Sequence, residues 1–179
     1  MSTGRTGFFR IRGAALACSL LAAGCGARSS LELPRIEGCQ DQTTILEVPS
    51  TTPWFDTGID VTAGQVLQIT ATGTVSYGEL PEQVTDADGG HYSGQKFFDT
   101  AVLPNTVVVS LIGKIGGSAA VDTGELLPEG APDSGPGFVG AVYEEVMPVS
   151  GRLFLGFNDR KNAFGDNIGA FTVTLTLSC

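Results

Sequence analysis

The end of the chain constrains the fold most, because it alternates strictly between apolar and polar residues. Between Phe171 and Leu177, every second side chain is large and apolar, and a threonine stands at each position between them. A period of two residues is that of a β-strand, in which successive side chains point to opposite faces of a sheet. The sequence therefore predicts a half-buried strand here, with one face in a core.

Similar runs recur along the chain and give the fold class. The predicted strands fall in Thr43–Val48, Gln65–Ser76, Thr106–Ile112, Phe138–Tyr143, Leu153–Phe157 and Phe171–Leu177. The run Thr106–Ile112 is almost continuously apolar, which is typical of a central strand. Most of the 25 glycines and 9 prolines lie between these runs, as turn residues do, and no segment has an apolar stripe of helical spacing. We expect an all-β sandwich or barrel over residues 43–179.

The first 24 residues have the layout of a secretory signal peptide. Three arginines precede the short apolar run Ala14–Ala23, which is too short to span a bilayer as a mature helix. The run ends in Leu21-Ala22-Ala23-Gly24-Cys25, which resembles a bacterial lipobox and predicts lipidation of Cys25; ordinary cleavage that leaves Cys25 free is the alternative. Residues 25–42 then form a tether. Gly26 gives no inner-membrane signal, so we expect an exported protein that is lipid-anchored to the cell envelope at the outer membrane, with an extracellular location as the alternative.

Charge and cysteine content limit the partners of the exported part. Removal of the three leader arginines from ten basic residues leaves seven against nineteen acidic ones, a formal charge of −12. Such a surface repels nucleic acid and anionic membranes and suits a chain that binds cations or neutral ligands. Export implies an oxidising compartment, so a disulfide between Cys39 and Cys179 is expected, with two unpaired thiols as the alternative.

The segment with the most chemistry is Phe157–Asn167, which joins two predicted strands. Side-chain oxygens recur in it at Asp159, Asp166 and Asn167, and calcium takes six to eight oxygen ligands of this kind. Asn, Asp and Gly are also the residues of ordinary hairpin turns, so spacing alone leaves both interpretations open. An EF-hand is excluded, because its ligand spacing and glycine are missing.

The ending Leu-Gly-Phe-Asn-Asp…Gly-Asp-Asn-Ile-Gly-Ala-Phe-Thr-Val-Thr-Leu, with Ser76-Tyr77-Gly78 earlier in the chain, resembles the PA-IL-like family of bacterial galactophilic lectins. These proteins are calcium-dependent, jelly-roll β-sandwiches of the galactose-binding kind. The resemblance covers roughly Thr43 to Ser178. It implies a calcium ligand set made of the carbonyls of Tyr77 and Ala163 and the side chains of Asp159, Asp166 and Asn167. A carboxylate at Asp166 replaces the family's asparagine.

The same resemblance implies a sugar site beside the ion. Asp159 and Asp166 would contact the sugar together with the calcium, and His91 falls where the family's sugar-binding histidine stands. The glutamine position matches less well: the strict position is Gly94, and Gln95 is one residue later. Arg160 replaces a small apolar residue, so it either extends over the sugar or crowds it.

These observations predict a non-enzymatic, calcium-dependent binder of a galactose-type glycan on an exported lipoprotein, possible as a homo-oligomer. The alternative is a structural or assembly lipoprotein in which calcium clamps loops and no sugar binds. A complete acid/base pair for a hydrolase is missing, because Glu144 and Glu145 are adjacent and face opposite sides of a strand. A zinc site is not expected from one histidine.

Overall fold

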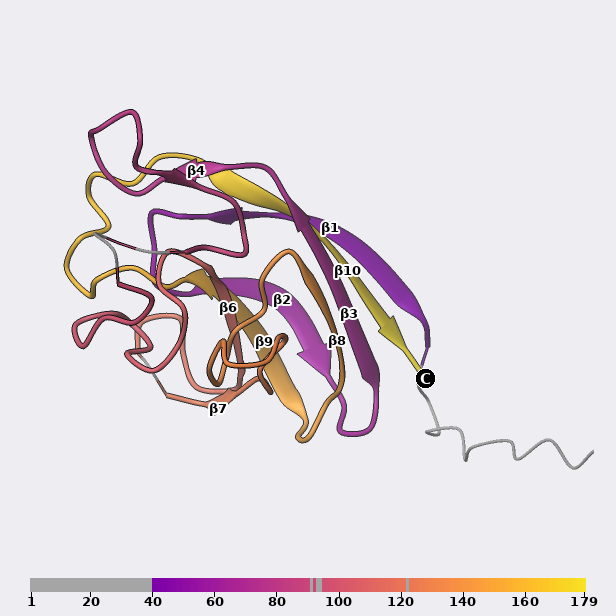
Figure 1. Cartoon of the computed structure of the whole chain (residues 1–179). Helices are drawn as coiled ribbons and strands as arrows, with labels where there is room; N and C mark the ends of the chain where they lie inside the picture. The colour runs from indigo at the N-terminus through magenta and orange to yellow at the C-terminus, as the bar shows by residue number, and fades with distance from the viewer. Residues whose placement is uncertain (1–39, 91, 93–94, 122) are drawn as a thin grey trace, which may run out of the picture. The chain divides into compact units, whose positions relative to one another are not determined.

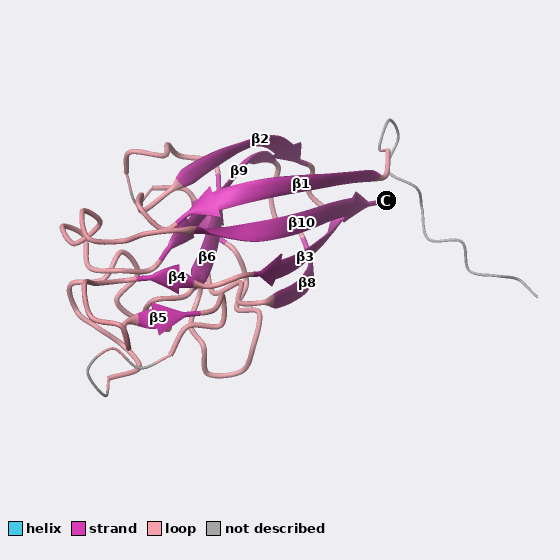
Figure 2. Ribbon diagram, turned by 90° about the horizontal axis from the view of Figure 1, so that it is seen from above, coloured by secondary structure: helices cyan, strands magenta, loops and turns pink. Residues whose placement is uncertain are grey.

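The structure is a computed structural model that describes residues 40–90, 92, 95–121 and 123–179 of the 179-residue chain. In this part the chain contains ten β-strands and no helix (Figure 2). The search of the described residues for a helix of membrane-spanning length and hydropathy finds none. The predicted signal peptide (residues 1–24), the lipidation site Cys25 and nearly all of the predicted tether lie outside the described residues.

The strands form a sandwich of two four-stranded antiparallel sheets, as the alternating sequence pattern predicts. One sheet has the order β1-β10-β3-β8, the other β2-β9-β6-β7, and β4 pairs with β5 alone (Figure 1). The bounds are β1 Gln42–Pro49, β2 Phe55–Val61, β3 Val66–Thr72, β4 Val75–Ser76, β5 Val84–Thr85, β6 Leu111–Ile115, β7 Glu125–Leu126, β8 Val142–Val146, β9 Gly151–Phe157 and β10 Ala170–Ser178. The inward side chains of both large sheets share one buried cluster, so the all-β sandwich prediction is confirmed.

Strand β10 is the clearest case of the predicted pattern. Its apolar residues Phe171, Val173, Leu175 and Leu177 are at most 2% exposed, and the threonines between them lie on the outer face. The strand pairs with β1 on one side and β3 on the other. A slip of one residue would turn the whole apolar row to solvent, so this register is strongly fixed.

The predicted strand Thr106–Ile112 is wrong over its first five residues. Residues 106–110 form a buried loop, and β6 begins only at Leu111. The amide nitrogen of buried Asn158 donates to the carbonyls of Leu103, Thr106 and Val107 at 2.8–3.1 Å, so a side chain satisfies these groups in place of a strand. A continuous apolar run identifies burial, and it does not identify the backbone conformation that achieves burial.

Other boundaries differ for local reasons. The predicted strand Gln65–Ser76 is divided at Gly73, whose φ of 96° ends β3 before β4 begins. Strand β8 overlaps the predicted strand Phe138–Tyr143 only at Val142 and Tyr143. Strand β2 was not predicted, because its Asp and Gly residues obscured a regular alternation of buried side chains.

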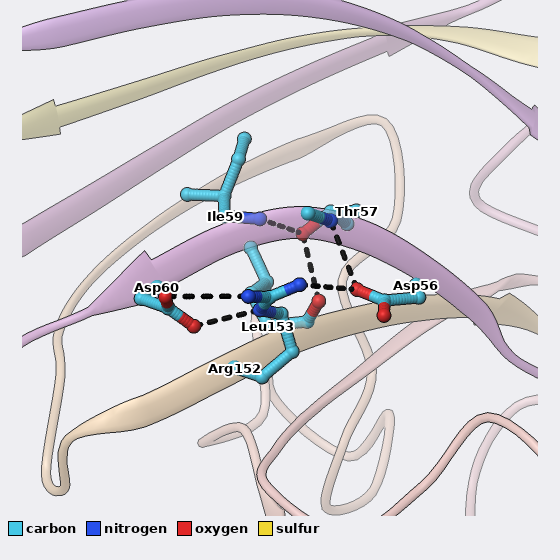
Figure 3. A network of polar contacts seen from close by, with 7 residues as sticks. Asp56, Thr57, Ile59, Asp60, Arg152 and Leu153 are labelled. Atoms are coloured by element: carbon cyan, nitrogen blue, oxygen red, sulfur yellow. Dashed lines mark hydrogen bonds and ion pairs between the residues drawn. The ribbon is translucent and has the colours of Figure 1, made fainter.

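Strand β2 pairs antiparallel with β9, and the register of this pairing shifts between Asp56 and Asp60. Side chains bridge the interruption (Figure 3): the Thr57 hydroxyl donates to the Leu153 carbonyl at 2.7 Å and accepts from the Ile59 amide. Arg152 donates to both Asp56 and Asp60, at 3.2 and 2.6 Å. The pKa of Asp56 is lowered mainly by the hydrogen bond from the Gly58 amide, and that of Asp60 mainly by the hydrogen bond from Arg152.

We expect Arg152→Gln to lower stability at neutral pH and to matter less as the pH falls. Folding lowers the pKa of both carboxyls below 3.8, so their contribution is complete above that pH and is lost as the pH falls through the lowered values. Urea unfolding of wild type and variant at about pH 7 and about pH 2.5 measures this. An equal difference in unfolding free energy at both pH values would contradict the assignment.

The two ends of the described chain lie side by side. Gln42 is opposite Leu177 in the β1–β10 pair, and the Cys179 amide donates to the Asp41 carboxylate at 3.2 Å. Cys179 is disulfide-bonded. Its predicted partner, Cys39, lies outside the described residues, two positions before Asp41.

We expect reduction of this disulfide to destabilise the domain by about 4–5 kcal/mol, because a bridge from Cys39 to Cys179 would close a loop of roughly 140 residues in the unfolded chain. Urea unfolding with and without a reductant measures the difference. The double variant Cys39→Ser/Cys179→Ser is the control, and it should not respond to the reductant. Recovery of both cysteines as free thiols in non-reducing peptide mapping would refute the bridge.

Candidate functional site

Two segments far apart in sequence meet at one end of the sandwich. Ser76, the last residue of β4, exchanges backbone hydrogen bonds with Ile168 at 2.9 and 3.0 Å. The pairing is antiparallel, so Tyr77 lies next to Asn167. Figure 1 shows the loop between β9 and β10 at the end of the domain opposite the C-terminus. The two segments that the sequence singled out are therefore neighbours.

Asp159 lies just beyond the end of β9 and is 3% exposed. Its backbone carbonyl accepts from the Val102 amide at 2.9 Å, and its Oδ1 accepts from the Arg160 amide at 2.7 Å. Its Oδ2 is buried and has no hydrogen-bond partner. Burial raises the pKa of this carboxyl, and the charge of Asp166 adds to the effect, whereas the Arg160 amide, the Asn167 side chain and the Arg160 charge act in the opposite direction.

Asn167 is 4% exposed and is held in one orientation. Its amide nitrogen donates to the Ser50 carbonyl at 2.8 Å. A carbonyl only accepts, so the nitrogen must face Ser50 and the oxygen must face away. That Oδ1 is also buried without a partner. An unsatisfied buried oxygen costs about 1–3 kcal/mol, so two of them in one loop indicate a site for an electron-pair acceptor.

The other predicted ligands contribute less buried oxygens. Tyr77 and Ala163 are half-buried, and within the described chain no hydrogen bond ends on the carbonyl oxygen of either residue. The Ala163 amide donates to the Arg160 carbonyl, which closes a turn. Asp166 is exposed, and it is close enough to Asp159 to affect its pKa.

These donors suit one class of ion. Among residues 40–179 outside the four undescribed positions, no three His, Cys, Asp or Glu side chains gather so that they could hold a metal ion by themselves. The predicted donors are two carboxylates, one amide oxygen and two backbone carbonyls. Hard oxygens of this mixed kind are what calcium takes. The two unpartnered oxygens of Asp159 and Asn167 are the part of the set that most needs a cation.

The predicted sugar residues are only partly placed. His91 lies outside the described residues. Gln95 is exposed and exchanges backbone hydrogen bonds with Tyr92 at 2.9 and 3.0 Å. The Tyr92 ring lies 5.6 Å from the ring of Tyr77, so this pair of residues borders the metal candidates.

The Arg160 side chain lies against two aromatic rings beside the candidate ligands. Its guanidinium carbon lies 4.6 Å from the centre of the Tyr92 ring and 4.3 Å from that of Phe98. It also lines a hollow of about 500 Å³ together with Asp99, Thr100, Lys161, Asn162 and Ala163. A smaller hollow of about 310 Å³, lined partly by Pro53 and Val121, shares Lys161 with it but contains none of the candidate ligands.

Sequence reasoning missed the aromatic residues that support this site. Tyr92 and Phe98 stand in no periodic pattern, and only the fold brings their rings together edge to face, 5.5 Å apart, beside Arg160. Asn158 directly precedes the candidate ligand Asp159 and also carries a side-chain oxygen. The structure gives Asn158 another role, because all its side-chain hydrogen bonds fix residues 103–107.

Comparison with known proteins adds a fold relationship. No protein-family profile and no curated protein sequence matches this chain. A solved structure described as the N-terminal domain of EclA, a PllA-like lectin, is similar with a TM-score of 0.53 and 22% identity. The similarity covers 75% of this chain and 95% of that domain. It supports a lectin-type β-sandwich fold, and membership of the PA-IL-like family stays a prediction.

We expect calcium to raise the unfolding free energy of the wild-type domain by about 2.7 kcal/mol at a hundred times its Kd, and a chelator to reverse the gain. Asp159→Asn should abolish this response, because the variant loses the buried charge while keeping the shape of the side chain. Thermal unfolding with calcium and with chelator measures it. The control is Asp99→Asn, which removes a carboxylate from the same end of the domain and should respond like wild type. A calcium response that survives Asp159→Asn would refute the site.

Proposed function

We propose that this chain is a calcium-dependent carbohydrate-binding domain for a galactose-type glycan, carried by an exported, lipid-anchored lipoprotein. The observation that carries the proposal is the pair of buried, unpartnered oxygens on Asp159 and Asn167. They lie at the same end of the fold as a hollow large enough for a sugar ring. The fold relationship to a domain described as a lectin supports the same class of function.

The residues have separate roles in this proposal. Asp159, Asp166 and Asn167 would hold the ion with their side chains, and Tyr77 and Ala163 with their carbonyls. The bound ion supplies coordination positions for two neighbouring hydroxyls of a sugar. His91 and Gln95 would bind the rest of the ring, next to the Tyr92 ring. Selection then follows from the stereochemistry of a diol and needs no reaction.

Binding explains the carboxylates better than catalysis does. A glycosidase needs an acid and a base or nucleophile that both reach the substrate. Asp159 is buried and one of its oxygens accepts from the Arg160 amide, so in this proposal it is a fixed ligand of the ion and does not reach the substrate. The role proposed for this domain is recognition.

The position of the site suits a tethered protein. The described chain begins at Gln40, beside Cys179, and the candidate site lies at the opposite end of the sandwich (Figures 1 and 2). A lipid on Cys25 would hold the end with the termini toward the membrane. The sugar site would then face outward, where a glycan is accessible.

The direct test is retention on a galactose resin. We expect the domain to be retained in calcium and released by a chelator, because the hydroxyls bind through the ion. His91→Ala should elute earlier and still show the full calcium-dependent rise in melting temperature, since the histidine is assigned to the sugar alone. Titration calorimetry with calcium and with a galactoside separates the two effects.

Two results would count against the proposal in different ways. A calcium-dependent rise in melting temperature without binding to any galactoside or to a glycan array would select a structural lipoprotein in which the ion only clamps the loops. Equal loss of calcium affinity in His91→Ala and Asp159→Ala would contradict the division of roles.

A further inference from the structure

Arg160 makes no close ion pair in the described part of the chain, although its charge acts on the carboxyl of the neighbouring Asp159. Neither an ion pair nor a hydrogen bond is formed by its side chain with any residue that the structure describes, and its Nε is buried without a partner. The guanidinium carbon instead lies 4.6 and 4.3 Å from the centres of the Tyr92 and Phe98 rings. Arg152 in β9 provides the contrast, because two carboxylates neutralise it.

Contact with both rings holds the guanidinium in place, and within the described residues none of its N–H groups has a hydrogen-bond partner. Packing against two rings orders a side chain that otherwise loses much rotamer freedom on binding. An arginine held in this way is prepared to receive a planar, two-oxygen anion through two parallel hydrogen bonds. The acidic residues of the chain far outnumber the basic ones, so an unneutralised arginine in such a hollow is an exception that needs an explanation.

The charge around the hollow agrees with an anionic ligand. Arg160 and Lys161 line it with a single carboxylate, that of Asp99. A calcium ion would offset the charges of Asp159 and Asp166 beside it. The hollow would then carry excess positive charge only when the ion is bound.

We propose that the site prefers an acidic sugar, a galactose-type ring whose sixth carbon is a carboxylate, as in a galacturonic acid residue of a polysaccharide. This inference rests on the proposed function, because calcium must first hold the ring through its hydroxyls. Arg160 then receives the carboxylate in a bidentate pair. Arg160 is thus the specificity-determining residue.

The test compares three ligands that present the same ring hydroxyls. These are methyl α-galactopyranoside, methyl α-galactopyranosiduronic acid and the methyl ester of that acid, which keeps the ring and its hydroxyls and removes the charge. Titration calorimetry of the calcium-loaded domain gives each Kd. We expect the acid to bind roughly tenfold more tightly than its ester at low salt, and we expect the ratio to shrink at about 1 M salt.

Variants assign the preference to one side chain. In Arg160→Gln the ratio of the acid and ester Kd values should fall to about one, whatever the absolute affinity becomes. Arg152→Gln is the matched control: it removes an arginine from the adjoining strand and should keep the tenfold ratio. The calcium-dependent rise in melting temperature checks that each variant has kept its metal site.

The outcomes separate this inference from the proposed function. Equal Kd values for acid and ester in the wild type would overturn the acidic-sugar preference and leave galactoside binding standing. A tenfold ratio that persists in Arg160→Gln would overturn the role of Arg160. Failure of all three ligands to bind in calcium would overturn the proposed function and this inference with it.

Discussion

The site depends on one pair of backbone hydrogen bonds, those between Ser76 and Ile168. They continue the β3–β10 pairing beyond the ends of these strands, after a turn at Gly73, whose φ is 96°. Without this contact, the Tyr77 turn and the loop before β10 would be separate surface loops. With it, oxygens from residues about ninety positions apart lie at one end of the sandwich, on a frame whose register the apolar row of β10 fixes.

Buried polar groups then give the loop its shape. Asn158 satisfies four backbone groups of residues 103–107, and Ser50 fixes the amide of Asn167. These bonds leave two oxygens, on Asp159 and Asn167, facing no donor. The surrounding polar groups are satisfied, but two buried acceptors in the same loop are not. Their burial has a local energetic cost that a bound cation would remove. In the proposed function, stability and calcium binding are therefore coupled in this loop.

Tertiary packing also produced features that no sequence pattern predicted. Lys114 is fully buried in β6, where its ammonium lies 4.3 Å from the centre of the Trp54 ring and donates to the carbonyls of Ser118 and Val121. Arg160 is treated in a similar way, stacked on two rings. In both cases aromatic faces hold a cation, and in both cases the rings come from segments that only the fold brings together.

The sequence by itself determined the fold class and the candidate ligands. Period-two alternation in residues 171–177 requires a sheet with one buried face. Recurring oxygen side chains in residues 159–167 identify the loop that contains the candidate ligands. It did not determine that residues 106–110 are a loop, that Gly73 divides a strand, or where Arg160 points. Those outcomes depend on partners distant in the chain, such as Asn158 for the loop and Tyr92 for the arginine. Local patterns report burial and turn chemistry, and only the packed structure decides which distant groups meet.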